Sequence, residues 1–356
     1  MPFSDYLYSD ELNDYVRNSV QPGLSDIIGD SSTMMKLLLN QGRTDALDQH
    51  KATAGMMWAA GPKVEKTIRI DLLDSVGWHQ DYQVFDPSPN RVTTSAQMRW
   101  ARARAHIVWT KDDDLAVRAG GTGELKTVIC LNRLRDKYNE AYAALADMMG
   151  DALYGYVDTV PEPYGLGLLA GRYVAGSYGG IDRSWMGIDS TNLAAWDSYR
   201  DAVEHPAADL VDPASTSYLP TVIDDLIYST SFGGFGLSNI VMNQAEYRVF
   251  ENILRDKRVI GDAQVGDLGY EYIKHKGKTI AWDSKMPDHH CYGLNLAAVF
   301  GGKPCLYIVG REGGWYDETE WQGSQNTLEL VKHITVNYNL WCDNPRFQGA
   351  ITRLGE

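Results

Sequence analysis

The segment that comes nearest to a chemical motif is the glycine-rich run at residues 120–127, GGTGELKT. A phosphate-binding P-loop needs a glycine directly before its lysine, so that backbone N–H groups can wrap around the phosphates. Leu125 takes that position, and the acidic run Asp112–Asp114 stands where a buried strand should precede the loop. The run is therefore more typical of a hinge into the following helix. A phosphate-binding enzyme that uses residues 120–127 is kept as the weaker alternative.

A second group of residues could in principle bind a metal. The side chains that zinc prefers gather at Asp283, Asp288, His289, His290 and Cys291. Neighbouring side chains on an extended segment point to opposite faces, so His289 and His290 would not both reach one ion. We interpret Met286-Pro287-Asp288 as a surface loop before a strand and assign no metal ligand.

Two arginines on one predicted strand form the third candidate. Arg102 and Arg104 share a face by strand alternation, whereas Arg99 lies opposite and Trp100 stands between them. Such a cluster could contact nucleic acid, but the chain carries a net charge of −14 and lacks an overall basic footprint. Arginine favours ion pairs between subunits, so pairing with carboxylates of a neighbouring subunit is the preferred interpretation.

The overall composition points away from an enzyme and from a membrane protein. The chain has 356 residues, 44% of them hydrophobic, which is enough for one large domain or a few smaller ones. Its four cysteines contain no CxxC pair and are expected to be isolated, reduced thiols of a cytoplasmic setting. The chain shows no GxSxG or HExxH motif, no signal peptide at its N-terminus and no membrane span. We therefore assign no catalytic, cofactor-binding or metal-binding residue.

Periodicity predicts a loose N-terminal arm followed by a long β-hairpin. A short helix is expected at 34–39 after good N-cap residues. Ile68, Ile70 and Leu72 alternate with polar residues, and residues 101–109 alternate in the same way. We expect these two segments to be the strands of one hairpin over 64–109. Because an isolated hairpin is marginally stable in water, it is expected to lie on another subunit.

The rest of the chain mixes helices and strands. Apolar residues repeat every three or four positions over 125–154, which predicts one long amphipathic helix. A shorter helix is expected at 220–229, and a strand at 240–242 precedes Asn243 and Glu246, which resemble a capping box. Alternation over 328–340 predicts one long strand near the C-terminus. The fold class is therefore α+β.

The order of these elements resembles the major capsid proteins of tailed bacteriophages, the fold type of phage Hong Kong ninety-seven. Four local phrases carry the resemblance: residues 178–184 after the long helix, the strand 239–242 with Asn243 and Tyr247, Asp283 with Pro287 and then 292–295, and Asn344-Pro345 after the last strand. The resemblance implies an N-terminal arm at 1–59, an extended loop at 60–112, a peripheral domain at 113–216 with a spine helix at 125–154, an axial domain at 217–319, and a return to the peripheral domain at 320–356.

The resemblance also implies a function. Such a protein would not be an enzyme; it would assemble with itself into hexamers and pentamers of an icosahedral shell around double-stranded DNA, without sequence-specific binding. It would be part of the virion, would assemble in the host cytoplasm, and would meet portal and scaffolding or decoration proteins but no membrane. A bacterial nanocompartment shell, of the encapsulin kind, is the alternative. The residues expected at the interface between subunits are Ile68, Ile70, Leu72, Arg99, Trp100, Arg102 and Arg104.

Overall fold

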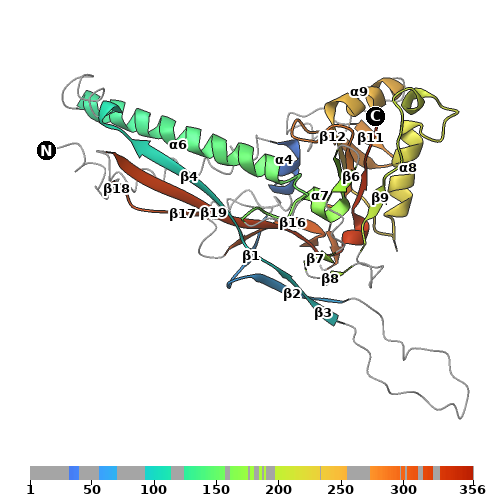
Figure 1. The fold of residues 1–356 in the computed structure, drawn as a ribbon, viewed down its shortest axis with the longest axis horizontal. Coiled ribbons are helices and arrows are strands. Elements are labelled where there is room, and N and C mark those ends of the chain that lie inside the picture. Colours follow the sequence, from blue (N-terminus) through green and yellow to red (C-terminus); the bar gives the residue numbers. More distant parts are fainter. Residues whose placement is uncertain are drawn as a thin grey trace, which may run out of the picture.

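The computed structural model is built around two six-stranded sheets, one hairpin that projects away from them and one long helix (Figure 1). It describes residues 32–39, 56–69, 93–113, 124–156, 161–174, 177–179, 184–186, 188–189, 197–232, 234–254, 273–296, 298–300, 303–311, 316–323 and 329–355. The helix and the first sheet lie at one end of the molecule, and the second sheet with two shorter helices lies at the other. The fold is α+β, as predicted.

The first sheet is organised around one long strand. β19 (Leu330–Cys342) pairs antiparallel with β4 (Ala101–Trp109) along one edge, and with β16 (Leu306–Arg311), β17 (Tyr316–Glu318) and β18 (Gln322–Gly323) along the other. β1 (Met56–Ala59) joins β16 in parallel, and helix α4 (Thr33–Leu39) lies beside β16. Leu340, Trp341 and Cys342 are all buried, so the C-terminal end of β19 passes through the core.

Helix α6 (Glu124–Ala152) runs along β4 (Figure 1). Its apolar positions fall three or four residues apart and form one stripe, which is buried against the sheet. The buried residues of this stripe are Leu134, Tyr138, Tyr142, Leu145 and Met149. Its 29 residues span about 44 Å at 1.5 Å per residue. The helix predicted at 125–154 is thus confirmed almost to the residue.

The second sheet has the strand order β11 (Ile273–His275), β12 (Lys278–Trp282), β10 (Asn239–Met242), β13 (Cys291–Leu294), β20 (Gly349–Ile351) and β9 (Tyr199–Asp201). Helices α8 (Leu219–Ser229) and α9 (Gln244–Ile253) and the short turn η3 (Asp209–Val211) pack with it around a separate apolar core. Lys276 and Gly277 have φ of 45° and 76° and form the tight turn between β11 and β12. The helix predicted at 220–229 and the strand at 240–242 are confirmed.

Shorter elements connect these layers. They are α7 (Leu166–Ala170), η5 (Pro345–Phe347) and the two-stranded pairs β5 (Arg172–Val174) with β6 (Ser177–Gly179), β7 (Ser184–Trp185) with β8 (Ile188–Asp189), and β14 (Ala298–Phe300) with β15 (Lys303–Pro304). Asn243 caps α9, because its Oδ1 accepts from the N–H of Ala245 at 2.9 Å, but the predicted capping box is incomplete, since the N–H of Asn243 donates to the carbonyl of His290 and not to Glu246.

The strand pairing of the predicted hairpin is wrong in one respect. β2 (Val64–Arg69) pairs antiparallel with β3 (Thr93–Met98), with Val64 opposite Met98. Residues 101–109 form β4 and pair with β19 instead. The alternation of 101–109 was therefore correctly interpreted as a strand but assigned to the wrong partner, because the true partner follows more than two hundred residues later.

Candidate assembly surfaces

The face of β4 that turns away from α6 presents the exposed arginines. Arg102, Arg104 and His106 are exposed in alternation with buried Ala101 and Ala103. Opposite them on β19 stand Asn337, Thr335 and His333, which share the same face because directly paired residues on antiparallel strands point the same way. We call this face, formed by Arg102, Arg104, His106 and His333, the basic strip.

The basic strip carries positive charge without a carboxylate of its own. Among the described side chains, no carboxylate forms an ion pair with Arg102 or Arg104, whereas Arg133 and Lys137 on α6 both pair with Asp113. The pKa of His333 is lowered by its partial burial and further by the charges of Arg104 and His106. His333 therefore tends to stay neutral, and the arginines supply the fixed charge of the strip.

The opposite, inward row of β4 already has a partner within its own subunit. Ala101, Ala103 and Ile107 are 1%, 5% and 2% exposed and pack between the sheet and α6. This corrects the expectation that the alanine row needs a neighbouring subunit to cover it. The row faces its own helix because β4 pairs with β19 in the first sheet and is not the return arm of a free hairpin.

Arg99 and Trp100 are likewise engaged within the subunit. The indole N–H of Trp100 donates to the carbonyl of Gly61 at 2.9 Å, and its side chain is buried. The guanidinium of Arg99 lies 5.1 Å from the ring centre of Tyr164 and donates to the carbonyl of Glu162. Both residues therefore hold the crossover from β3 to β4 in place, and their role at an interface stays a prediction.

The base of the hairpin is anchored to the body of the molecule. Val64, Ile68, Ala96 and Met98 are buried, and the N–H of Gln97 donates to the carbonyl of Met186 at 3.0 Å. Ile68 is thus covered by its own subunit. Ile70 and Leu72 lie outside the described residues, so their predicted place at the interface stays a prediction.

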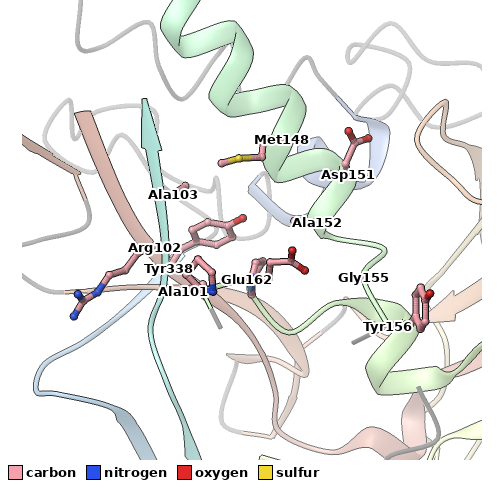
Figure 2. Close-up of a pocket in the computed structure, with 12 residues that line it drawn as sticks. Ala101, Arg102, Ala103, Met148, Asp151, Ala152, Gly155, Tyr156, Glu162 and Tyr338 are labelled. Atoms are coloured by element: carbon pink, nitrogen blue, oxygen red, sulfur yellow. The ribbon is translucent and has the colours of Figure 1, made fainter. Parts of the chain in front are cut away.

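A hollow of ≈ 500 Å³ lies between the C-terminal part of α6 and the first residues of β4 (Figure 2). Small side chains create it: Ala101 and Ala103 on the strand and Ala152 on the helix leave space that larger residues would fill. Met148 lies over it and is 45% exposed, while Arg102 extends away from it. Its described lining contains no histidine, cysteine, serine or lysine, and its acidic side chains are Asp151 and Glu162.

Asp283 is a buried carboxylate with four hydrogen-bond donors, a role that no motif predicted. Its carboxylate accepts hydrogen bonds from the N–H of Met34 at 2.8 Å, the hydroxyl of Tyr154 at 2.9 Å and the N–H of Lys285 at 2.9 Å, and also from the hydroxyl of Ser32. Burial, followed by the charge of Asp283, raises the pKa of Tyr154 well above its usual value. Asp283 therefore joins the start of α4, the end of α6 and the second sheet.

The histidines beside Asp283 do not converge. His289 has a φ of 62°, and its Nδ1 lies 2.6 Å from the carbonyl of Leu354, whereas His290 is buried and stacks on Tyr292. Within the described ranges, no three His, Cys, Asp or Glu side chains are grouped so that they could hold a metal ion. Residues 120–123 of the glycine-rich run lie outside the described residues, and 124–127 form the first turn of α6.

Comparison with known proteins identifies the fold. No family model and no curated protein matches the chain. Among solved structures, the chain is similar to the capsid asymmetric unit of cyanophage A-1(L), with a TM-score of 0.59, 12% identity, and coverage of 91% of this chain and 92% of that one. The chain therefore has the tailed-phage major capsid fold, which confirms the resemblance drawn from the sequence at the level of fold.

Two further solved structures are similar at lower scores. The encapsulin of the holo-SrpI complex from Synechococcus elongatus gives a TM-score of 0.48 and 9% identity over 89% of this chain and 90% of that one. The capsid of the native GTA particle gives 0.48 and 12% identity over 84% and 87%. No helix in the described ranges is long and apolar enough to span a membrane.

Proposed function

We propose that this protein is the major capsid protein of a tailed phage, which assembles with itself into hexamers and pentamers of an icosahedral head around double-stranded DNA. The observation that carries the proposal is the capsid fold over 91% of the chain. The projecting hairpin supports it, because β2 and β3 pair with each other and, within the described residues, with neither of the two sheets. A projecting two-stranded element gains stability when another surface covers it.

The basic strip is the surface we assign to contact with a neighbouring subunit. Strand pairing fixes the backbone of its arginines, so the Cα atoms of Arg102 and Arg104 lie about 7 Å apart on the same face of the strand. The chain is acidic, with 47 Asp and Glu against 33 Lys and Arg, so a neighbouring copy offers many carboxylates to such a row. A single exposed ion pair contributes only about 0.2–1 kcal/mol, but a closed shell repeats each contact many times.

The negative net charge of the chain also fits a shell that encloses DNA without binding it tightly. Few phosphates would be neutralised by a chain of net charge −14, so binding to free duplex should be weak.

Portal, scaffolding and decoration proteins are further expected partners of a phage head, and assembly would take place in the host cytoplasm before the protein becomes part of the virion.

The test is to image the purified full chain by negative stain and measure its sedimentation. Shells, or rings of five and six subunits, are expected; a monodisperse monomer over a wide concentration range would contradict the proposal. Shells that retain a co-purified protein cargo and no nucleic acid when produced in their natural host would favour the nanocompartment alternative instead.

The double variant R102E/R104E tests the basic strip. It should fold with a near-normal thermal midpoint and assemble poorly, because both side chains are exposed and form no ion pair with a described residue of the subunit. The matched control R135E/R248E changes the net charge equally at two other exposed arginines and should assemble normally. If both variants assembled equally well, the basic strip would not be part of the interface between subunits.

A further inference from the structure

Two of the four cysteines, far apart in the sequence, meet where β16 and β19 come together. Leu306, the first residue of β16, is directly opposite Cys342, the last residue of β19. One step beyond, the N–H of Asp343 donates to the carbonyl of Cys305 at 2.8 Å. Residues one step out of register on adjacent strands have Cα atoms roughly 5–7 Å apart, which is within the range that a protein disulfide spans.

The two sulfur atoms also share one hydrogen-bonding environment. The thiol of Cys305 donates to the carbonyl of Asn344 at 3.3 Å. After burial, the Cys305 thiol raises the pKa of Cys342 and the backbone of Asn344 lowers it, so both groups lie near the Cys342 sulfur. A regular antiparallel ladder would turn these side chains to opposite faces, but the chain bends at Cys305 and at Asp343, and the bends bring them together.

Both thiols are buried, at 2% and 0% exposure, and neither is bonded to another cysteine. Burial, and then the Cys305 thiol, raise the pKa of Cys342 well above its usual value, so this thiol keeps its proton in the reduced protein. The pair lies next to Asp343, which accepts a hydrogen bond from Lys66 on the hairpin. A disulfide formed between these cysteines would therefore lie beside the contact between Lys66 and Asp343 that holds the base of the hairpin.

We propose that Cys305 and Cys342 are a modification site that forms an intramolecular disulfide on reaction with a small-molecule disulfide such as oxidised glutathione. One protein thiolate attacks the oxidant and releases one reduced glutathione, which leaves a mixed disulfide. The second thiolate attacks this bond, releases the second reduced glutathione and closes the protein disulfide. Two protein thiols are oxidised, one glutathione disulfide is reduced, and each protein thiol gives up one proton. This inference goes beyond the proposed function and does not depend on it.

The experiment counts free thiols in the full chain. The protein is brought to equilibrium in buffers of reduced and oxidised glutathione, quenched with acid, denatured, alkylated with iodoacetamide and weighed by mass spectrometry. All four thiols should be alkylated under reducing conditions, and two should be lost together under oxidising conditions. Peptide mapping should identify the bond as Cys305–Cys342, and the thermal midpoint of the oxidised protein should rise.

Three variants and one further measurement make the result decisive. C305S and C342S should each abolish the loss of two thiols, whereas C130S should retain it, because Cys130 is buried on α6 and has no part in this pair. Because burial limits access of the oxidant, the same buffers are also used while the full chain refolds from urea. Four alkylated thiols after both treatments, or a disulfide that involves Cys130 or Cys291, would overturn the proposal.

Discussion

The ammonium group of Lys66, on hairpin strand β2, lies 2.5 Å from the carboxylate of Asp343, which directly follows β19. The same carboxylate accepts from the indole N–H of Trp341 at 2.8 Å and from the hydroxyl of Tyr307 at 3.4 Å. One acidic side chain thus ties the base of the projecting hairpin to two strands of the first sheet. The pair connects the element expected to contact a neighbour with the rigid body of its own subunit.

Replacing Lys66 with Met should cost little stability. The two side chains of the ion pair are 41% and 29% exposed, so solvent screens their attraction. We expect the free energy of unfolding in urea to fall by about 0.5–1 kcal/mol at low salt, and the difference to shrink at 1 M salt. Lys111→Met, at an exposed position after β4, is the control and should change nothing measurable. A loss that is large and independent of salt would show that Lys66 acts through packing instead.

Replacing Asp283 with Asn should be far more costly. The carboxylate is 1% exposed and accepts from four donors, and an amide would turn an N–H group toward some of them. Buried hydrogen bonds to a charged group contribute about 1.5–3 kcal/mol each, so we expect a loss of roughly 3 kcal/mol or more in urea unfolding. Asp136→Asn, on the exposed face of α6, should be neutral. Equal stability of the two variants would mean that the Asp283 network contributes nothing net.

Glu246 should make the stability depend on pH. Its carboxyl group is buried at the start of α9, and Oε2 has no hydrogen-bond partner among the described residues. Burial is the largest effect and raises its pKa above the ordinary 4.5, although His289 partly opposes this. The folded state therefore holds this proton more tightly than the unfolded state, so stability falls as the pH rises from 4.5 through the raised pKa.

Glu246→Gln removes that titration and tests the sign. The variant should unfold at a higher temperature than the wild type at pH 8, and the difference should narrow as the pH falls toward 4.5. Thermal midpoints of both proteins are measured across this range. Glu251→Gln, farther along the same helix, serves as the control. A wild type that is the more stable protein at pH 8 would show that the pair with His289, at 3.6 Å, outweighs the burial cost.

Gly165→Ala should destabilise the connection after α6. A Cβ at this position would lie 2.4 Å from the carbonyl oxygen and 2.5 Å from the nitrogen of Gly155, and backbone atoms cannot move aside cheaply. Overpacking of this kind costs about 1–3 kcal/mol. Gly323→Ala, which would meet nothing within 4 Å, is the matched control. Equal thermal midpoints for the two variants would show that the two segments separate more easily than the close contact implies.

The elements that sequence analysis predicted well are those that local spacing determines. α6 and α8 follow from apolar residues three and four apart, and the cap at Asn243 follows from its own side chain. What sequence analysis missed is long-range pairing. The alternation of β4 is compatible with any antiparallel partner. Its row of alanines is equally compatible with packing against a neighbouring subunit and with packing against the subunit's own helix.

The polar connections were missed for the same reason. Nothing near Asp283 in the sequence indicates that the hydroxyl groups of Ser32 and Tyr154 donate hydrogen bonds to its carboxylate. Likewise, the sequence spacing of the cysteines carries no pair signal, yet Cys305 and Cys342 lie one step out of register where β16 and β19 pair. Tertiary structure creates these sites, so only their residue types can be recognised beforehand.

The last prediction concerns residues 71–91, part of the extended loop that the sequence predicts to lie on a neighbouring subunit. A deletion that tests this must not extend into β3, because Ala96 is buried and residues 93–98 pair with β2. Replacing residues 71–91 with a short Asn-Gly turn keeps the pairing of Arg69 with Thr93. The removed segment contains apolar residues such as Leu72 and Phe85, and covering one such side chain on a neighbour is worth roughly 1.5–3 kcal/mol.

The shortened protein should therefore keep one cooperative thermal transition but form few or unstable shells. Sedimentation and negative-stain imaging compare it with the wild type. The control is Asp74→Ser, which changes one side chain of the same segment without shortening the chain and should assemble like the wild type. Loss of the cooperative transition would place the tip in the core of its own subunit. Closed shells of normal size and stability would show that the clamp lies elsewhere, and the basic strip would then have to hold neighbours together without it.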